Sequence, residues 1–143
     1  MSEKNLTQLI DITTRNRIFS CRYWKEECFA LNAESIIDKA IKLKCIGGLY
    51  GGSKKPTKFL CLVFKMLQMN LPREICELYL AEREYKYLTA MAILFLRLTV
   101  KAPEIYSLLE PFYVDNRKLK SKNSIGILEL TFIDKFVEDL LSQ

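Results

Sequence analysis

The side chains that most often carry out chemistry in proteins are thinly represented in this sequence. Its 143 residues include no histidine, which removes the commonest general base and the usual nitrogen ligand of zinc. A zinc site would then need four thiolates from five cysteines, yet no two of them stand at C-x-x-C spacing. The alternative is that they are reduced, buried thiols of an intracellular protein; they are Cys21, Cys28, Cys45, Cys61 and Cys76. We therefore expect no catalytic residue, no metal and no cofactor.

Four of the five glycines fall within one segment, Gly47 to Gly52, whose backbone N–H groups could cradle a phosphate. The two end glycines have the spacing of a phosphate-binding loop, but Ser53 stands where that loop requires lysine. The preceding element is also predicted to be a helix rather than a strand. We favour a tight connection that lets two helices pack closely. The candidate partner-binding residues of this loop are Tyr50, Lys54 and Lys55.

A second candidate partner-binding site combines aromatic and charged side chains, namely Tyr23, Trp24, Lys25 and Glu26. Exposed aromatics beside charges supply contact area and orientation together, as at interface hot spots. The alternative, which we favour, is that Trp24 and Phe29 anchor the N-terminal segment on the core.

One charged side chain, Arg97, falls within an almost wholly apolar stretch. It must reach solvent along its stem, pair with a carboxylate, or bind a partner. We favour pairing inside the fold and keep Arg97 as a candidate partner-binding residue.

The net charge is +5, from 22 basic and 17 acidic residues, and such an excess favours polyanionic partners. A basic bias near residues 117–122 could contact RNA phosphates, although charges on a hairpin usually form a solvated face. The candidate RNA-contacting residues are Arg117, Lys118, Lys120 and Lys122. No aromatic RNP motif, KH loop or zinc knuckle accompanies them. Direct RNA binding by a basic surface is therefore the alternative function to protein binding.

The elements that position these residues are predicted to be mainly α-helical, in one compact multi-helix domain over residues 1–143. Half of the residues are hydrophobic, and only 5 glycines and 4 prolines are present, so the chain can fill a core and offers no evident linker. Apolar residues at helical spacing predict helices over residues 6–21, 33–44, 58–69, 72–81, 85–100, 103–116 and 132–141. The helix over 58–69 has only a narrow polar line, so we expect it to be buried nearly all round.

Local signals set the predicted boundaries of these elements. Asn32 and Thr57 are expected N-caps, and Thr131 with Asp134 is expected to cap the last helix. Pro111 must kink or restart the helix over 103–116, because proline removes an intrahelical donor. A turn signal at residues 123–126 predicts a short β-hairpin near residues 117–130.

Targeting signals are weak. The N-terminal residues 1–5 lack the apolar core of a secretory signal, so we expect a chain that is not exported. The longest apolar stretch, residues 88–96, is too short to cross a bilayer. We expect no membrane partner.

Several short segments form an ordered set across about residues 10–142. They are YWKEECF at 23–29, GGLYGG at 47–52, KPT at 55–57, FLCL at 59–62, KMLQ at 65–68, RLT at 97–99, LEP at 109–111 and DKF at 134–136. Together they resemble the N-terminal domain of the pre-mRNA-processing factor 38 family of spliceosomal proteins.

The resemblance implies a mostly helical nuclear scaffold without enzymatic activity. It implies binding of other splicing proteins around the tri-snRNP and B-complex stage, in support of spliceosome activation. The implied partners are a microfibrillar-associated protein 1 homologue and a small zinc-finger splicing protein, with no small-molecule substrate. Grooves between helices would receive partner helices or extended peptides.

Overall fold

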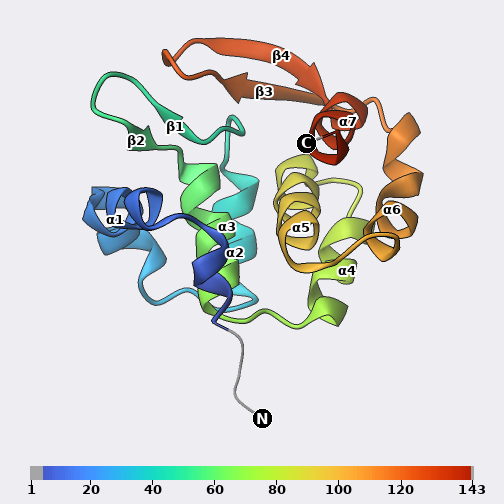
Figure 1. Ribbon diagram of the computed structural model, residues 1–143, viewed down its shortest axis with the longest axis horizontal. Coiled ribbons are helices and arrows are strands. Elements are labelled where there is room, and N and C mark those ends of the chain that lie inside the picture. The colour runs from blue at the N-terminus through green and yellow to red at the C-terminus, as the bar shows by residue number, and fades with distance from the viewer. Residues whose placement is uncertain (1–4, 143) are drawn as a thin grey trace.

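The structure is a computed structural model that describes residues 5–142. Residues 1–4, on which the expectation of a non-exported chain mainly rests, and residue 143 lie outside this range. Figure 1 shows a body of packed helices with two small β-hairpins along one side. The elements are η1 (Leu6–Leu9), α1 (Ile12–Ser20), η2 (Trp24–Cys28), α2 (Ser35–Ile41), β1 (Leu49–Tyr50), β2 (Lys55–Pro56), α3 (Lys58–Gln68), α4 (Arg73–Ala81), α5 (Lys86–Thr99), α6 (Glu104–Leu109), η3 (Glu110–Val114), β3 (Lys118–Lys122), β4 (Leu128–Phe132) and α7 (Ile133–Leu141). The mainly α fold with a hairpin near residues 117–130 is confirmed.

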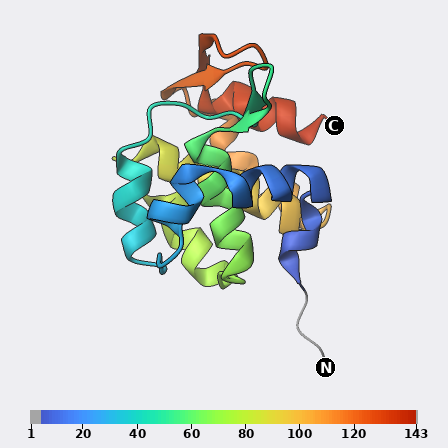
Figure 2. The same cartoon turned by 90° about the vertical axis from the view of Figure 1, so that its left-hand side faces the viewer.

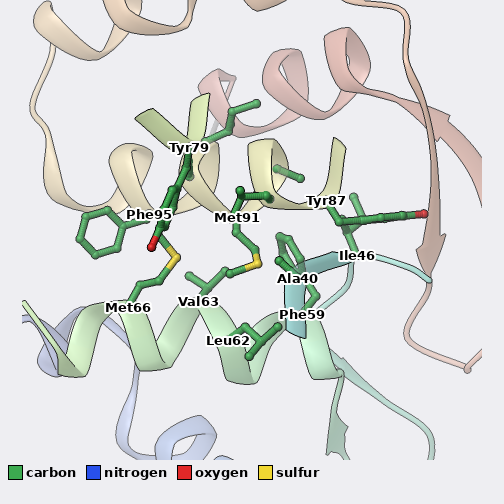
Figure 3. Packing of buried hydrophobic residues seen from close by; sticks show 14 of the residues in the cluster. Ala40, Ile46, Phe59, Leu62, Val63, Met66, Tyr79, Tyr87, Met91 and Phe95 are labelled. Carbon is green, nitrogen blue, oxygen red and sulfur yellow. The ribbon is translucent and has the colours of Figure 1, made fainter. Parts of the chain in front are cut away.

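The core centres on α3 and α5, which lie side by side (Figure 1). Every residue of α3 from Phe59 to Leu67 is buried, as predicted from its narrow polar line. In Figure 3, Met66 of α3 and Met91 and Phe95 of α5 lie between the two helices. Burying one such side chain stabilises the fold by about 1.5–3 kcal/mol. The other helices pack around this central pair, α3 and α5.

Of the three predicted N-caps, Thr57 is confirmed, whereas α2 begins at Ser35, two residues later than predicted, so that Asn32 acts in the turn before it and Glu34 stands at the N-cap position. The hydroxyl oxygen of Thr57 accepts a hydrogen bond from the backbone N–H of Leu60 at 3.1 Å at the start of α3. The side-chain oxygen of Asn32 accepts two backbone N–H bonds in the turn that leads into α2. The third prediction is wrong, because Thr131 lies inside β4 opposite Leu119, and α7 begins without a side-chain cap.

Two of the predicted helices are divided. Residues 6–21 form η1 and α1 instead of one helix, because the Asp11 carboxylate accepts the N–H of Thr14 at 3.1 Å and starts a new helix. The apolar periodicity runs across this cap and concealed it. Pro111 restarts the later helix as predicted, since α6 ends at Leu109 and η3 begins at Glu110.

Residues 24–28 form the π-helical turn η2. Trp24 is buried and packs edge-on against Phe19, with ring centroids 5.6 Å apart, and against Phe64 of α3 at 5.4 Å. The structure therefore agrees with the favoured interpretation that Trp24 anchors the N-terminal segment on the core. The same role for Phe29 is wrong, because its side chain is 78% exposed. Its carbonyl oxygen accepts a hydrogen bond from the Lys65 amine at 3.0 Å.

Both hairpins are antiparallel, and Ile46 joins them by a parallel bridge to β3. The Ile46 N–H donates to the Lys120 carbonyl at 2.8 Å, and its own carbonyl accepts the Lys122 N–H at 2.9 Å. Gly47, with φ +150°, follows directly, and a Cβ there would lie 2.8 Å from the carbonyl oxygen of Lys122. The glycine segment therefore permits a close backbone approach, here between two hairpins, and it contains the small strand β1 that was not predicted.

Candidate interaction surfaces

Five of the predicted contact residues line one hollow of about 850 Å³, namely Tyr23, Tyr50, Lys54, Lys55 and Lys122. The hollow lies between the end of α1, the segment after α2, the β1–β2 hairpin and the start of α3. Figure 2 faces this side of the molecule, with α1 in front of the core and the hairpins above. The bridge at Ile46 brings residues from distant parts of the sequence to this one place, which we call the basic hollow.

The neighbours of Tyr23 in sequence have different environments. Trp24 is 8% exposed, so little of its indole is accessible to a partner. Lys25 and Glu26 are exposed on η2, and the Glu26 carboxylate lies 3.2 Å from Nε of Arg22 in an exposed ion pair. Exposed pairs of this kind contribute at most about 1 kcal/mol. Partner binding by Lys25 and Glu26 stays a prediction.

Arg97 lies elsewhere in the molecule. Its Nε donates to the carbonyl oxygen of Leu140 at 3.0 Å, which ties α5 to the end of α7. This bond accords with the favoured interpretation that Arg97 is engaged inside the fold. The residue lines a separate hollow of about 600 Å³, whose other lining side chains include Leu9 and Tyr106. The structure therefore does not bring Arg97 together with the other candidates.

Arg117 belongs to a buried ion pair. Its Nη2 lies 2.7 Å from Oδ2 of Asp115, and its Nη1 donates to the carbonyl oxygen of Arg83 at 3.1 Å. Burial alone would raise the pKa of Asp115, but the hydrogen bonds and charge of Arg117 outweigh it, so the pKa lies below the usual value of 3.8. The sequence did not indicate this role of Arg117. Asp115 and Arg117 are neighbours in sequence, but their contacts with Arg83 join them to the α4–α5 loop, which is more than 30 residues away.

The other cations of β3 follow the strand alternation. Leu119 is buried, and Lys118 and Lys120 are exposed. The Lys122 amine lies over the ring of Tyr50, 4.4 Å from its centroid, and faces the basic hollow. The four predicted RNA-contacting residues are thus divided between an ion pair, an exposed strand face and a hollow. RNA contact by this set stays a prediction.

A row of exposed aliphatic side chains on and before β4 was not anticipated from the sequence. They are Ile125, Ile127, Leu128 and Leu130, each 48–72% exposed. Among residues 5–142, β4 pairs only with β3, so its other edge has no strand partner. Exposed apolar side chains beside a free edge are typical of surfaces that pair with another chain. The signal in the sequence is the alternation of Leu128 and Leu130 with Glu129 and Thr131, which gives β4 one apolar face.

The cysteines are free thiols, with Cys28, Cys61 and Cys76 buried. Cys21 and Cys61 approach to 3.6 Å between sulfur atoms. Burial raises the pKa of Cys28 to about 12 and raises the pKa of Cys61 further. Within residues 5–142 no group of three or more histidine, cysteine or acidic side chains is placed to hold a metal ion, and no helix there is long and apolar enough to cross a membrane.

The fold and these surfaces define a class, that of small, mainly helical domains that present open hollows and a free strand edge. The chain belongs to the PRP38 family, because the sequence model of that family matches residues 1–143. The family resemblance derived from the short segments above is thereby confirmed.

Individual relatives agree with this assignment. The chain is 45% identical over 137 residues to Pre-mRNA-splicing factor 38 of Drosophila melanogaster and 44% identical over 137 residues to Pre-mRNA-splicing factor 38A of Homo sapiens. These alignments cover 96% of this chain but 42% and 44% of the relatives, so the chain spans less than half of their length.

A solved structure has the same fold. It is a chain from the crystal structure of the Snu23-Prp38-MFAP1(217-258) complex of Chaetomium thermophilum, which matches with a TM-score of 0.92 and 39% identity. The match covers 99% of this chain and 74% of that chain.

Proposed function

We propose that this domain is a non-catalytic scaffold of pre-mRNA splicing, which binds other splicing proteins in the nucleus. The observation that carries the proposal is the match, at 39% identity and a TM-score of 0.92, to a chain crystallised within the Snu23-Prp38-MFAP1(217-258) complex. Splicing factors 38 and 38A at 44–45% identity support the same role. The proposed partners are homologues of MFAP1 and of Snu23, and we identify Snu23 with the small zinc-finger protein that the family resemblance implies. The proposed setting is the tri-snRNP and B complex, before spliceosome activation.

The free edge of β4 is the surface that we assign to one of these partners. A strand edge offers backbone N–H and C=O groups to an extended peptide, and side chains beside it supply specificity. Leu128 and Leu130 are 48% and 63% exposed on this strand. Beneath it, a groove of about 640 Å³ runs between β4, α3 and α7, lined by apolar side chains such as Phe59 and Phe136. A partner segment with apolar side chains at alternate positions would bury both leucines.

A titration by calorimetry tests the assignment, with the MFAP1 segment homologous to that of the solved complex as ligand. In the variant L128S/L130S we expect binding at least tenfold weaker. Each leucine contributes about 1–2 kcal/mol when a partner covers it, and 1.4 kcal/mol is a factor of ten. Because both side chains are exposed in the free domain, its stability should hardly change.

The matched control is L78S/V114S, which removes two aliphatic side chains that are 67% and 86% exposed outside β4. We expect this variant to bind as the unaltered chain does. If the control loses affinity and the β4 variant does not, the docking surface has been misassigned. If the folded, unaltered chain binds neither MFAP1 nor Snu23 segments, the proposed function itself is wrong.

A further inference from the structure

The basic hollow has an unusual charge pattern. Eight cationic side chains line it, and no acidic residue among residues 5–142 does. Arg17 and Arg22 come from α1 and the turn behind it, and Lys42 and Lys44 come from the segment that follows α2. More than a third of the chain's 22 basic residues thus face one hollow. A concave surface with one sign of charge focuses its field on a ligand of the opposite sign.

The remaining cations of the hollow are Lys54 and Lys55 of the β1–β2 hairpin, Lys58 at the start of α3, and Lys122 of β3. Within the described part of the chain, the four have no carboxylate within ion-pair distance. Among residues 5–142, Arg22 is the single one of the eight cations with such a partner, in its exposed contact with Glu26. The charge of the hollow is therefore left largely uncompensated by the fold.

Glu27 does not line the hollow, but its carboxylate interacts with two of the hollow's cations. It is held by Lys39 at 2.6 Å, and this bond lowers the pKa of Glu27, with smaller contributions from Lys58 and Lys42. Its charge is thus used mainly outside the hollow.

Several contacts keep the hollow in shape. Nη1 of Arg17 donates to the carbonyl oxygen of Ser53 at 3.0 Å, which ties the β1–β2 hairpin to α1. The amine of Lys58 lies over the ring of Tyr23 at 5.3 Å, as Lys122 lies over Tyr50. The cations are therefore placed by separate elements that converge on one site, and two aromatic rings stand among them.

Two polyanions could fit such a site, an acidic protein segment or an RNA strand. Cores of protein interfaces are depleted of lysine and built around apolar anchors, whereas six of the eight cations here are lysines. Phosphate contacts, in contrast, are made largely by lysine and arginine, and aromatic rings offer faces on which bases stack. The composition of the hollow therefore favours RNA.

We propose that the basic hollow binds the phosphate backbone of a single-stranded segment of RNA. This site is distinct from the exposed face of β3, with which it shares Lys122 alone among the RNA-contacting residues predicted from the sequence. Its lining residues differ from those of the groove beneath β4, and the two sites adjoin at the hairpin, where Lys122 pairs with Leu128.

Fluorescence anisotropy with a labelled oligouridylate tests this proposal. For single strands, the affinity falls with salt with a slope of about −0.7 per phosphate contacted. If four cations make such contacts, raising the salt from about 50 mM to about 200 mM weakens binding about 50-fold. In the variant K55Q/K58Q two contacts are lost, and the same change in salt should weaken binding only about sevenfold.

The matched control is K86Q/K101Q, which removes the same charge outside the hollow. Each pair contains one exposed lysine and one lysine over a tyrosine ring, Lys86 lying 5.7 Å from that of Tyr87. We expect the control to keep the steep salt dependence. An equal loss in both variants, or a flat salt response of the unaltered chain, would overturn the proposal. Tighter binding of polyglutamate than of RNA would overturn it in favour of an acidic protein segment.

Discussion

The buried carboxylate of Asp115 connects the hairpin that carries the proposed docking edge to the helices. Its side chain is 2% exposed and accepts bonds from the Arg117 guanidinium at 2.7 Å and from the Arg117 backbone N–H at 3.0 Å. Arg83 from the α4–α5 loop approaches to 3.3 Å. The Asp115 carbonyl oxygen also accepts the N–H of Asp134 at the start of α7, at 2.8 Å. We expect the substitution Asp115→Asn to loosen this junction.

The expected loss follows from burial. Removing one partner of a buried ion pair destabilises a protein by about 3–5 kcal/mol, because the other charge is left uncompensated. Asparagine keeps an oxygen for the backbone N–H, and Arg117 is 17% exposed, so we expect about 3 kcal/mol, measured by urea unfolding at neutral pH. The control Asp139→Asn breaks an exposed pair with Lys135 at 2.9 Å and should leave the stability nearly unchanged.

The pH dependence checks the cause. Because the folded state holds the pKa of Asp115 below 3.8, its contribution to stability is present above that pH and is lost as the pH falls through the folded pKa. The gap in unfolding free energy between the unaltered chain and Asp115→Asn should therefore be constant near neutrality and shrink below pH 3.8. A loss under about 1 kcal/mol at neutral pH, or a gap that does not narrow in acid, would refute the reasoning.

Three further predictions concern the junctions around the hollow and the core. Gly47→Ala should destabilise the domain by about 1–3 kcal/mol in urea unfolding, because its Cβ would lie 2.8 Å from a main-chain oxygen of β3, whereas Gly48→Ala meets nothing within 4 Å and should be near neutral. Tyr87→Phe should lower the melting temperature, since its hydroxyl bonds two main-chain groups at 3.2 and 2.9 Å and about 1–3 kcal/mol is lost; the exposed Tyr113→Phe should not. In thiol titration of the native protein, the partly exposed Cys21 and Cys45 should react first. The buried cysteines should react only on unfolding; they are Cys28, Cys61 and Cys76.

Local chemistry made much of the fold predictable. Thr57 and Pro111 act within a few residues of themselves, so the start of α3 and the break after α6 could be read from the sequence. Where two local signals competed, the prediction failed. Thr131 looks like a helix cap, yet pairing with Leu119 draws it into β4, and Asp11 interrupts an apolar pattern that continues past it.

The candidate surfaces were less predictable, because they depend on contacts between distant segments. Tyr50, Lys54 and Lys55 could be singled out from the glycine segment, but not their meeting with Tyr23 and the cations of α1. That meeting follows from the bridge at residue 46, which no local pattern encodes. The exposed row on β4 was overlooked for a different reason, since an apolar strand residue is ordinarily expected to be buried.

Native mass spectrometry of the purified chain mixed with homologous Snu23 and MFAP1 segments tests the central claim most directly. A scaffold for splicing proteins predicts a complex with one copy of each component, in which the MFAP1 segment is lost selectively from L128S/L130S. A folded chain that remains alone in the presence of both segments would contradict the account.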